Sequence, residues 1–234
     1  MTELDLRDRL EPVLDLLAAD RRSLSSVSAE RAWSVHVEDS LSGLGLVGKP
    51  TRLADVGAGA GFPGLALAAA LPRTEVDLIE SIGRKCAFIE DAIAAARLEN
   101  ARAVCARAED WAAQRPPAGG REAYDVVTSR AVGRLATVAE LAVPLLRPAG
   151  TLVVWKGRRD PDEEAELERA AGSLAIAVER VDRVPPSPGA GNRHLHLLRK
   201  VGPTPTGLPR RPGMAKKRPF GAPRRARGDR RPSG

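Results

Sequence analysis

The chain of 234 residues is poor in cysteine, in aromatic side chains and in long apolar runs. Two cysteines cannot build a disulfide scaffold, and a chain of this length buries enough surface to fold without one. No apolar run approaches the roughly 20 residues that a membrane span needs. The first twenty residues mix acidic with apolar side chains, unlike a signal peptide. We therefore expect a cytoplasmic globular protein, with Cys86 and Cys105 as reduced thiols that bind no metal.

The positive net charge of +7 is concentrated near the carboxyl end. Residues 201–234 contain ten Lys and Arg and one acidic residue, whereas residues 1–200 carry a net charge of −2. The same segment is rich in Pro and Gly and poor in large apolar side chains, so burial cannot offset the entropy lost on ordering. We predict that most of residues 201–234 is disordered. It is either an electrostatic arm for nucleic-acid phosphates or a solubilising extension.

Hydrophobic periodicity divides the rest of the chain into two parts. Apolar residues at helical spacing over 3–19, and after Ser28 over 29–41, predict an N-terminal helical extension in residues 1–45. Over residues 46–200, short apolar runs alternate with helical patterns, which is typical of a parallel sheet with helices on both faces. We predict a doubly wound α/β domain there, closed by an antiparallel pair at 175–181 and 194–198.

A glycine-rich turn follows the first predicted strand and spans Asp55–Gly64. Glycines permit a tight turn and a close approach of a ligand, and the next helix offers unpaired N–H groups. The segment matches both the G-x-G-x-x-G pattern of dinucleotide sites and the D-x-G-x-G-x-G pattern of S-adenosylmethionine sites. Glu80, at the end of the second predicted strand, suits a pair of ribose hydroxyls in either case.

Three observations favour the methyl donor over a dinucleotide. Asp55 can receive a cationic amine, which S-adenosylmethionine has and NAD lacks at that place. The segment Arg107–Glu109, just after the third predicted strand, lies where an adenine edge would be recognised. One Tyr and three His make the acid/base sets of hydride transfer difficult to assemble. Two alternatives stay open, an NAD-dependent oxidoreductase and a non-catalytic RNA-binding or assembly factor on the same fold.

Seven segments in order along residues 30–220 carry a more specific signal: His36–Leu41, Asp55–Gly64, Glu80–Lys85, Arg107–Glu109, Ser129–Val132, Trp155–Gly157 and Arg193–Leu195. They resemble the bacterial glucose-inhibited division protein B family, which methylates N7 of a guanine in 16S ribosomal RNA. The resemblance implies a class I S-adenosylmethionine-dependent methyltransferase, Rossmann-like, with a mostly parallel seven-stranded sheet. It implies as substrate the guanine conventionally numbered 527, in the 30S subunit or an assembly intermediate. We expect a monomer without a metal or a membrane anchor.

The resemblance and the chemistry together give candidate site residues. The predicted donor-binding residues are Asp55, Gly57, Gly59, Gly61, Phe62, Glu80, Ala108, Glu109 and Arg130. Guanine N7 has an in-plane lone pair and no proton, so its attack on a sulfonium methyl needs alignment and no general base. Arg130 and Lys156, at the ends of the fourth and fifth predicted strands, are the candidates to position the base. The alternatives are an ion pair for Arg130, for example with Glu140, and a solvated strand end for Lys156. The candidates for RNA contact are Lys85, Lys156, Arg193, Arg210, Arg211, Lys216 and Lys217.

Overall fold

A seven-stranded sheet forms the centre of the computed structural model, which describes residues 2–20, 24–185 and 192–222. The strand order is β3-β2-β1-β4-β5-β7-β6. The first five strands are mutually parallel, and β7 runs antiparallel to both of its neighbours. The strands are β1 Arg52–Val56, β2 Glu75–Glu80, β3 Ala101–Cys105, β4 Tyr124–Arg130, β5 Leu146–Lys156, β6 Ile176–Val184 and β7 Arg193–Lys200. The prediction of a mostly parallel α/β sheet closed by an antiparallel pair is confirmed.

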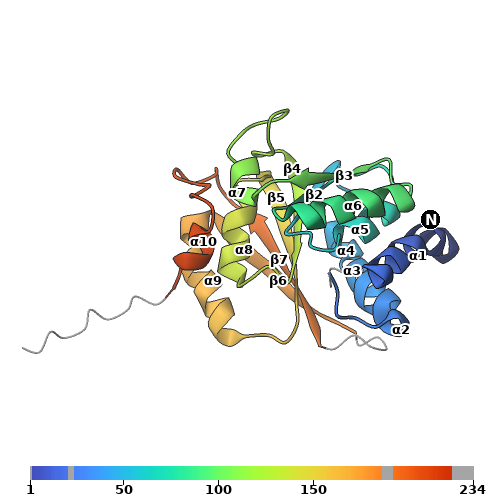
Figure 1. Ribbon diagram of the computed structural model, residues 1–234. Coiled ribbons are helices and arrows are strands. Elements are labelled where there is room, and N and C mark those ends of the chain that lie inside the picture. The colour runs from blue at the N-terminus through green and yellow to red at the C-terminus, as the bar shows by residue number, and fades with distance from the viewer. Residues whose placement is uncertain (1, 21–23, 186–191, 223–234) are drawn as a thin grey trace, which may run out of the picture.

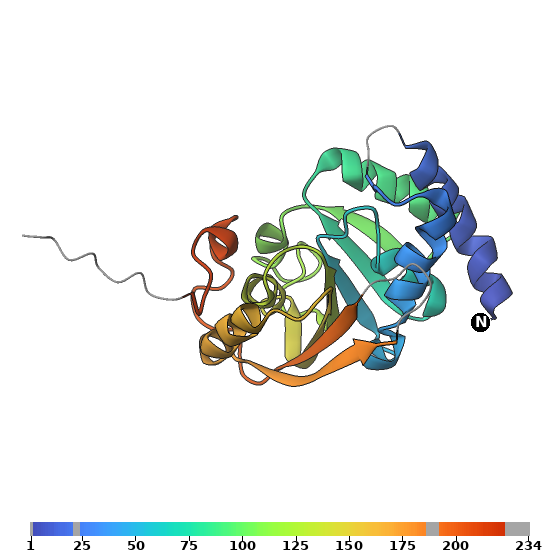
Figure 2. The same cartoon turned by 90° about the horizontal axis from the view of Figure 1, so that it is seen from below.

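Helices cover both faces of the sheet (Figures 1 and 2). One buried cluster packs α1 (Glu3–Ala19), α5 (Gly64–Ala70) and α6 (Gly83–Ala95) on one face. A second cluster packs α7 (Ala108–Trp111), α8 (Leu135–Ala142) and α9 (Pro161–Leu174) on the other. No helix in the described part of the chain is long and apolar enough to cross a membrane.

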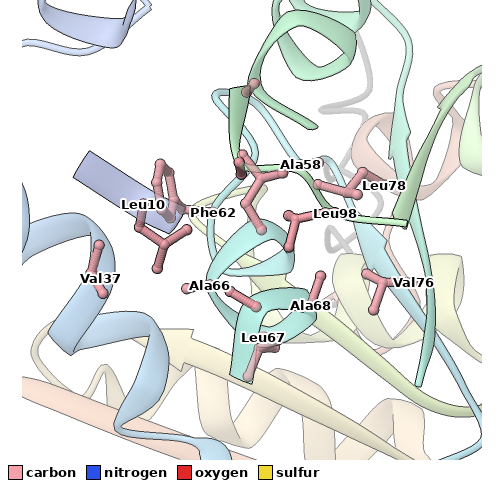
Figure 3. Close-up of a cluster of buried hydrophobic side chains, with 14 of the residues drawn as sticks. Leu10, Val37, Ala58, Phe62, Ala66, Leu67, Ala68, Val76, Leu78 and Leu98 are labelled. Carbon is pink, nitrogen blue, oxygen red and sulfur yellow. The ribbon is translucent and has the colours of Figure 1, made fainter. Parts of the chain in front are cut away.

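The N-terminal helices form a cover beside the glycine-rich turn. After α1 the chain continues through α2 (Ala29–Ala32), a π-helical turn (Trp33–Glu38), α3 (Asp39–Leu41) and α4 (Leu44–Val47). Figure 3 shows Leu10 and Val37 from this cover facing Phe62 of the turn and the side chains of α5. The ring of His36 stacks on that of Phe62, with 5.1 Å between centroids. The cover is therefore part of the same core as the sheet.

Residues 201–222, which we call the strap, are ordered in the structure, so the prediction of disorder is wrong for them. They bury Leu208 and Ala215, include the short helix α10 (Met214–Lys217) and form an ion pair between Arg210 and Glu140 of α8. Composition missed this because the attachment depends on a few polar contacts with distant residues. Residues 223–234, the rest of the predicted tail, lie outside the described residues.

The prediction of two reduced thiols is also wrong, because the structure joins Cys86 and Cys105 in a disulfide. Nineteen residues separate them along the chain, and their Cα atoms lie 5.6 Å apart. Parallel pairing of β2 with β3 sets Cys105 opposite Glu80, and α6 begins only three residues after Glu80. Tertiary pairing therefore brings together two cysteines whose spacing alone indicated no bond.

Candidate active site

The glycine-rich turn links the end of β1 to the start of α5. Gly57, Gly59 and Gly61 have φ values of +69°, +62° and +90°, a region that favours glycine. A Cβ at Gly57 would come within 2.4 Å of Val132, and one at Gly61 within 2.3 Å of Leu65. At Gly59 the nearest atom would be the Gly57 carbonyl oxygen, 3.8 Å away. Gly59 therefore faces open space that a side chain would fill, which fits a bound donor approaching the backbone.

Asp55 has a different role from the ligand contact that the sequence favoured. Its side chain is fully buried, so it presents no surface to the amine of a donor. One carboxylate oxygen accepts a hydrogen bond from the Gly64 N–H at 2.9 Å, and the other accepts from the Thr128 hydroxyl at 2.9 Å. Burial raises the pKa of Asp55 to about 6. The buried Asp55 side chain thus joins the turn to the start of α5 and to β4.

Glu80 lies at the end of β2, across the turn from Gly59. Its Oε2 accepts a hydrogen bond from the Gly59 N–H at 3.0 Å. Its Oε1 accepts from the N–H groups of Ser81 at 2.7 Å and Ile82 at 2.9 Å. The structure therefore places an acceptor with two oxygens directly beside the open space at Gly59. This arrangement suits the two neighbouring hydroxyls of a ribose.

The segment after β3 reaches the same edge of the sheet. The Ala106 N–H donates to the Glu80 carbonyl oxygen at 3.0 Å, which brings Ala108 and Glu109 near Glu80. Ala108 is buried. Glu109 accepts a hydrogen bond from the Gly213 N–H of the strap at 2.8 Å. Sequence reasoning missed this contact, because 104 residues separate the two partners.

A second group of candidates meets at Asp39, which sequence reasoning did not place among the site residues. The Arg130 Nη1 donates to Asp39 at 2.9 Å and to the Val35 carbonyl oxygen at 3.0 Å. Arg193 donates through Nε to the other Asp39 oxygen at 3.0 Å. Burial lowers the pKa of Arg130, and the facing Asp39 carboxylate opposes that shift. One buried carboxylate therefore holds two predicted cations, and Arg130 pairs with Asp39 in place of Glu140.

A signal for Asp39 was present in the sequence. Ala32, His36 and Asp39 share one helical face at spacings of four and three residues, and all three are buried. A carboxylate on a face otherwise shared with apolar and aromatic side chains is a candidate for a buried ion pair. Its partners, from β4 and β7, are not recoverable from local spacing.

The cavity around this ion-pair cluster has a volume of about 280 Å³. Trp155 is buried there and donates its indole N–H to the Asp39 carbonyl oxygen at 2.8 Å. His36 contacts the Ser25 hydroxyl through Nε2 at 3.0 Å, and burial lowers the pKa of His36 to about 4, so its ring is neutral at pH 7. The residues lining the cavity are Val35, His36, Asp39, Arg130, Ala131, Trp155, Lys156, Gly157 and Arg193.

Lys156 lines this cavity but is not a free cation. Its ammonium donates to Glu163 at 2.7 Å and to the Gly133 carbonyl oxygen at 3.1 Å. Glu163 also accepts a hydrogen bond from the Leu135 N–H at the start of α8. Lys156 therefore fixes the loop that carries Val132 over Gly57, and the alternative of a solvated strand end does not hold.

The remaining RNA candidates differ in how far they are exposed and engaged. Arg210 donates to Glu140 and to the carbonyl oxygen of Arg218, so it is not available as predicted. Lys85 is half-buried at the start of α6. The other three lie exposed on the strap: Arg211, Lys216 and Lys217.

The family model described as rRNA small subunit methyltransferase G matches residues 14–195. Among relatives named ribosomal RNA small subunit methyltransferase G, the one from Roseiflexus castenholzii is 41% identical over 205 residues, covering 86% of this chain and 85% of the relative. The one from Pelotomaculum thermopropionicum is 38% identical over 228 residues, covering 94% and 92%. The chain belongs to this family.

Solved structures agree with the fold. An O-methyltransferase from Bacillus cereus has a TM-score of 0.57 at 16% identity, with 86% of this chain and 92% of that chain covered. The O-methyltransferase TomG from Streptomyces achromogenes has a TM-score of 0.54 at 20% identity, with 82% and 90% covered. The comparisons confirm the predicted methyltransferase class and fold. Family membership also confirms S-adenosylmethionine as the cofactor, and the oxidoreductase alternative is left without support.

Proposed function

We propose that this protein transfers the methyl group of S-adenosylmethionine to N7 of a guanine in 16S ribosomal RNA, the position conventionally numbered 527. The observation that carries the proposal is the adjacency of two sites at the carboxyl ends of the parallel strands, where ligands bind in such sheets. The glycine-rich turn with Glu80 forms one site, and the cavity with Arg130 and Arg193 forms the other. The His36–Phe62 ring stack joins them.

The donor side fits the backbone and the carboxylates that the structure places there. Gly59 would admit the ligand, Glu80 would accept hydrogen bonds from its ribose, and the Ala108–Glu109 segment would border its adenine. When bound, S-adenosylmethionine supplies an electrophilic methyl group on its sulfonium. Val132, packed over Gly57, and the Lys156–Glu163 pair keep the loop after Arg130 in place, which helps to exclude water from the methyl group.

The base side fits guanine through its Hoogsteen edge. That edge presents two acceptors, O6 and N7, and a guanidinium next to O6 selects guanine over adenine, which carries a donor at the same position. Arg130 and Arg193 enter the cavity with their orientation fixed by Asp39. Fixed orientation matters because the only requirement of N7 is alignment with the methyl carbon and sulfur.

The charged groups around the cavity also match a reaction without a general base. Asp39 is engaged in two ion pairs, and burial holds the pKa of His36 at about 4. Neither is required to remove a proton, because N7 carries none. We further propose that the enzyme acts as a monomer in the cytoplasm, on a 30S subunit or an assembly intermediate.

The test uses labelled S-adenosylmethionine and 30S subunits from a strain that lacks the modification. Mass spectrometry of nuclease fragments then locates the label, which we expect as 7-methylguanine in the decoding-region loop. Arg193→Gln should abolish labelling, whereas Arg73→Gln, an equal charge loss at the exposed amino edge of the sheet, should not. Label on another atom or in another loop would refute the proposed target. Donor binding without any label would favour a non-catalytic RNA-binding factor.

A further inference from the structure

The strap crosses the first turns of α7 and α8, at the edge of the sheet that holds the donor site. The Gly213 N–H donates to Glu109 in α7 at 2.8 Å. The Thr137 hydroxyl, in the first turns of α8, donates to the Ala215 carbonyl oxygen at 3.3 Å. Figure 1 shows α10 beside α8 and α9. The strap therefore borders the donor site on the face of the sheet opposite the N-terminal cover.

Arg210 attaches the strap to α8 and also joins two parts of the strap to each other. We call its contacts the clasp. Its guanidinium binds Glu140, whose side chain is only 3% exposed, and lies 4.4 Å from the ring centroid of Phe220. The same guanidinium donates to the Arg218 carbonyl oxygen at 2.8 Å. Farther along, the Gly221 carbonyl oxygen accepts from Arg169 in α9 at 2.8 Å. These contacts attach the strap to α8 and α9 at several points along its length.

The clasp leaves a set of cations on the outer surface of the strap. Among the described residues none of them forms an ion pair, and each has an exposed position: Arg211, Lys216, Lys217 and Arg218. No acidic residue interrupts them between 209 and 220. No large apolar side chain is exposed in that stretch either. A protein interface has an apolar centre, whereas a phosphate backbone requires only cations, so the surface favours nucleic acid.

We propose that these four cations form a pre-assembled contact for the phosphate backbone of the substrate RNA, separate from the base cavity. The inference rests on the proposed function, since the RNA is the one whose guanine enters that cavity. Thr137, which touches the strap, lies only seven residues after Arg130, which lines the cavity. The start of α8 therefore links the cavity to the strap along the chain.

The first experiment measures binding of a 16S ribosomal RNA fragment carrying the target loop, over a series of salt concentrations. Lys216→Gln/Lys217→Gln should lower affinity and reduce the slope of log K against log salt by about 1.4, because each single-strand phosphate contact contributes about 0.7. Lys49→Gln/Arg73→Gln removes the same charge from the amino edge of the sheet, where both residues are exposed, and should leave the slope unchanged. An equal slope in the two double variants would overturn the inference.

The second experiment tests the clasp with Arg210→Gln/Glu140→Gln, which preserves the net charge and all four cations. A loosened strap loses conformational entropy when it becomes ordered on the RNA, so RNA binding should weaken at least about tenfold. Unchanged affinity would overturn the claim of pre-assembly. Donor affinity and methyl transfer by the parent protein are measured alongside. Transfer with no strap effect refutes only this inference, whereas a parent that binds no RNA refutes the proposed function as well.

Discussion

Replacing Gly59 by alanine should separate donor binding from folding. Gly59 has a φ of +62°, and a Cβ there would meet no atom closer than 3.8 Å. The cost to the fold is therefore only that of a left-handed alanine, about 1–2 kcal/mol. For a chain of this size each kcal/mol lowers the melting temperature by about 2–4 °C. The variant should remain folded at 25 °C.

The donor should be affected differently, because the new methyl group enters the space beside Glu80. Overpacking a well-fitted site by one methyl group costs about 1–3 kcal/mol. This corresponds to roughly a 5- to 150-fold loss of affinity. Calorimetric titration with S-adenosylmethionine measures the loss directly, and thermal unfolding without the donor measures the change in stability.

Gly207→Ala provides the matched control. Gly207 also has a positive φ, of +89°, and a Cβ there would meet nothing within 4 Å. It lies in the strap, away from the glycine-rich turn, so alanine should introduce the same type of backbone strain without a change in donor affinity. Equal donor affinities for the two variants would refute the placement of the donor at Gly59.

Two further predictions concern buried carboxylates. Asp39→Asn leaves Arg130 and Arg193 without their shared counter-charge, so the free energy of unfolding in urea should fall by about 3 kcal/mol and methyl transfer should be lost. Asp55→Asn should change the pH dependence of stability. Since burial raises the pKa of Asp55 to about 6, the native protein retains a proton that the unfolded chain releases near pH 4. As the pH rises from about 4 to 6, this group therefore lowers the wild-type free energy of unfolding by about 3 kcal/mol. The variant should lack that decrease.

The parent protein is the control for both of these variants. Asp39→Asn with full activity and native stability would show that the ion pairs do not orient the two guanidiniums. For Asp55→Asn, urea unfolding at several pH values gives the difference from the parent. A difference that stays constant from pH 4 to 6 would contradict the assignment of the raised pKa to Asp55.

Local signals predicted the elements of the fold well. The bounds of α1 match the predicted range 3–19, because apolar periodicity is a strong local signal. The segment over 29–41, predicted as one helix, contains the π-helical turn Trp33–Glu38. That irregularity precedes Asp39, whose ion pairs join residues 91 and 154 positions away. Periodicity contains no information about such distant partners.

In the candidate site, too, local features could be predicted from the sequence, whereas contacts with distant partners could not. The turn, Glu80 and Arg130 could be identified because their positions follow from strand ends. The roles of Asp55, Lys156 and Arg210 could not, because each depends on a buried partner supplied by another element. A carboxylate next to a glycine pattern has the same appearance in the sequence whether it faces a ligand or the core. Only the assembled sheet decides between the two.

The shared carboxylate of Asp39 has a consequence for where the catalytic unit begins. The cavity that we propose for the base combines a side chain from the N-terminal cover, one from β4 and one from β7. A fragment starting at residue 46 would retain the glycine-rich turn and every strand of the sheet. It would nevertheless lack Asp39, the carboxylate that holds Arg130 and Arg193 in place. We therefore expect the smallest active fragment to include the cover, because Asp39 from the cover orients the two arginines of the proposed site.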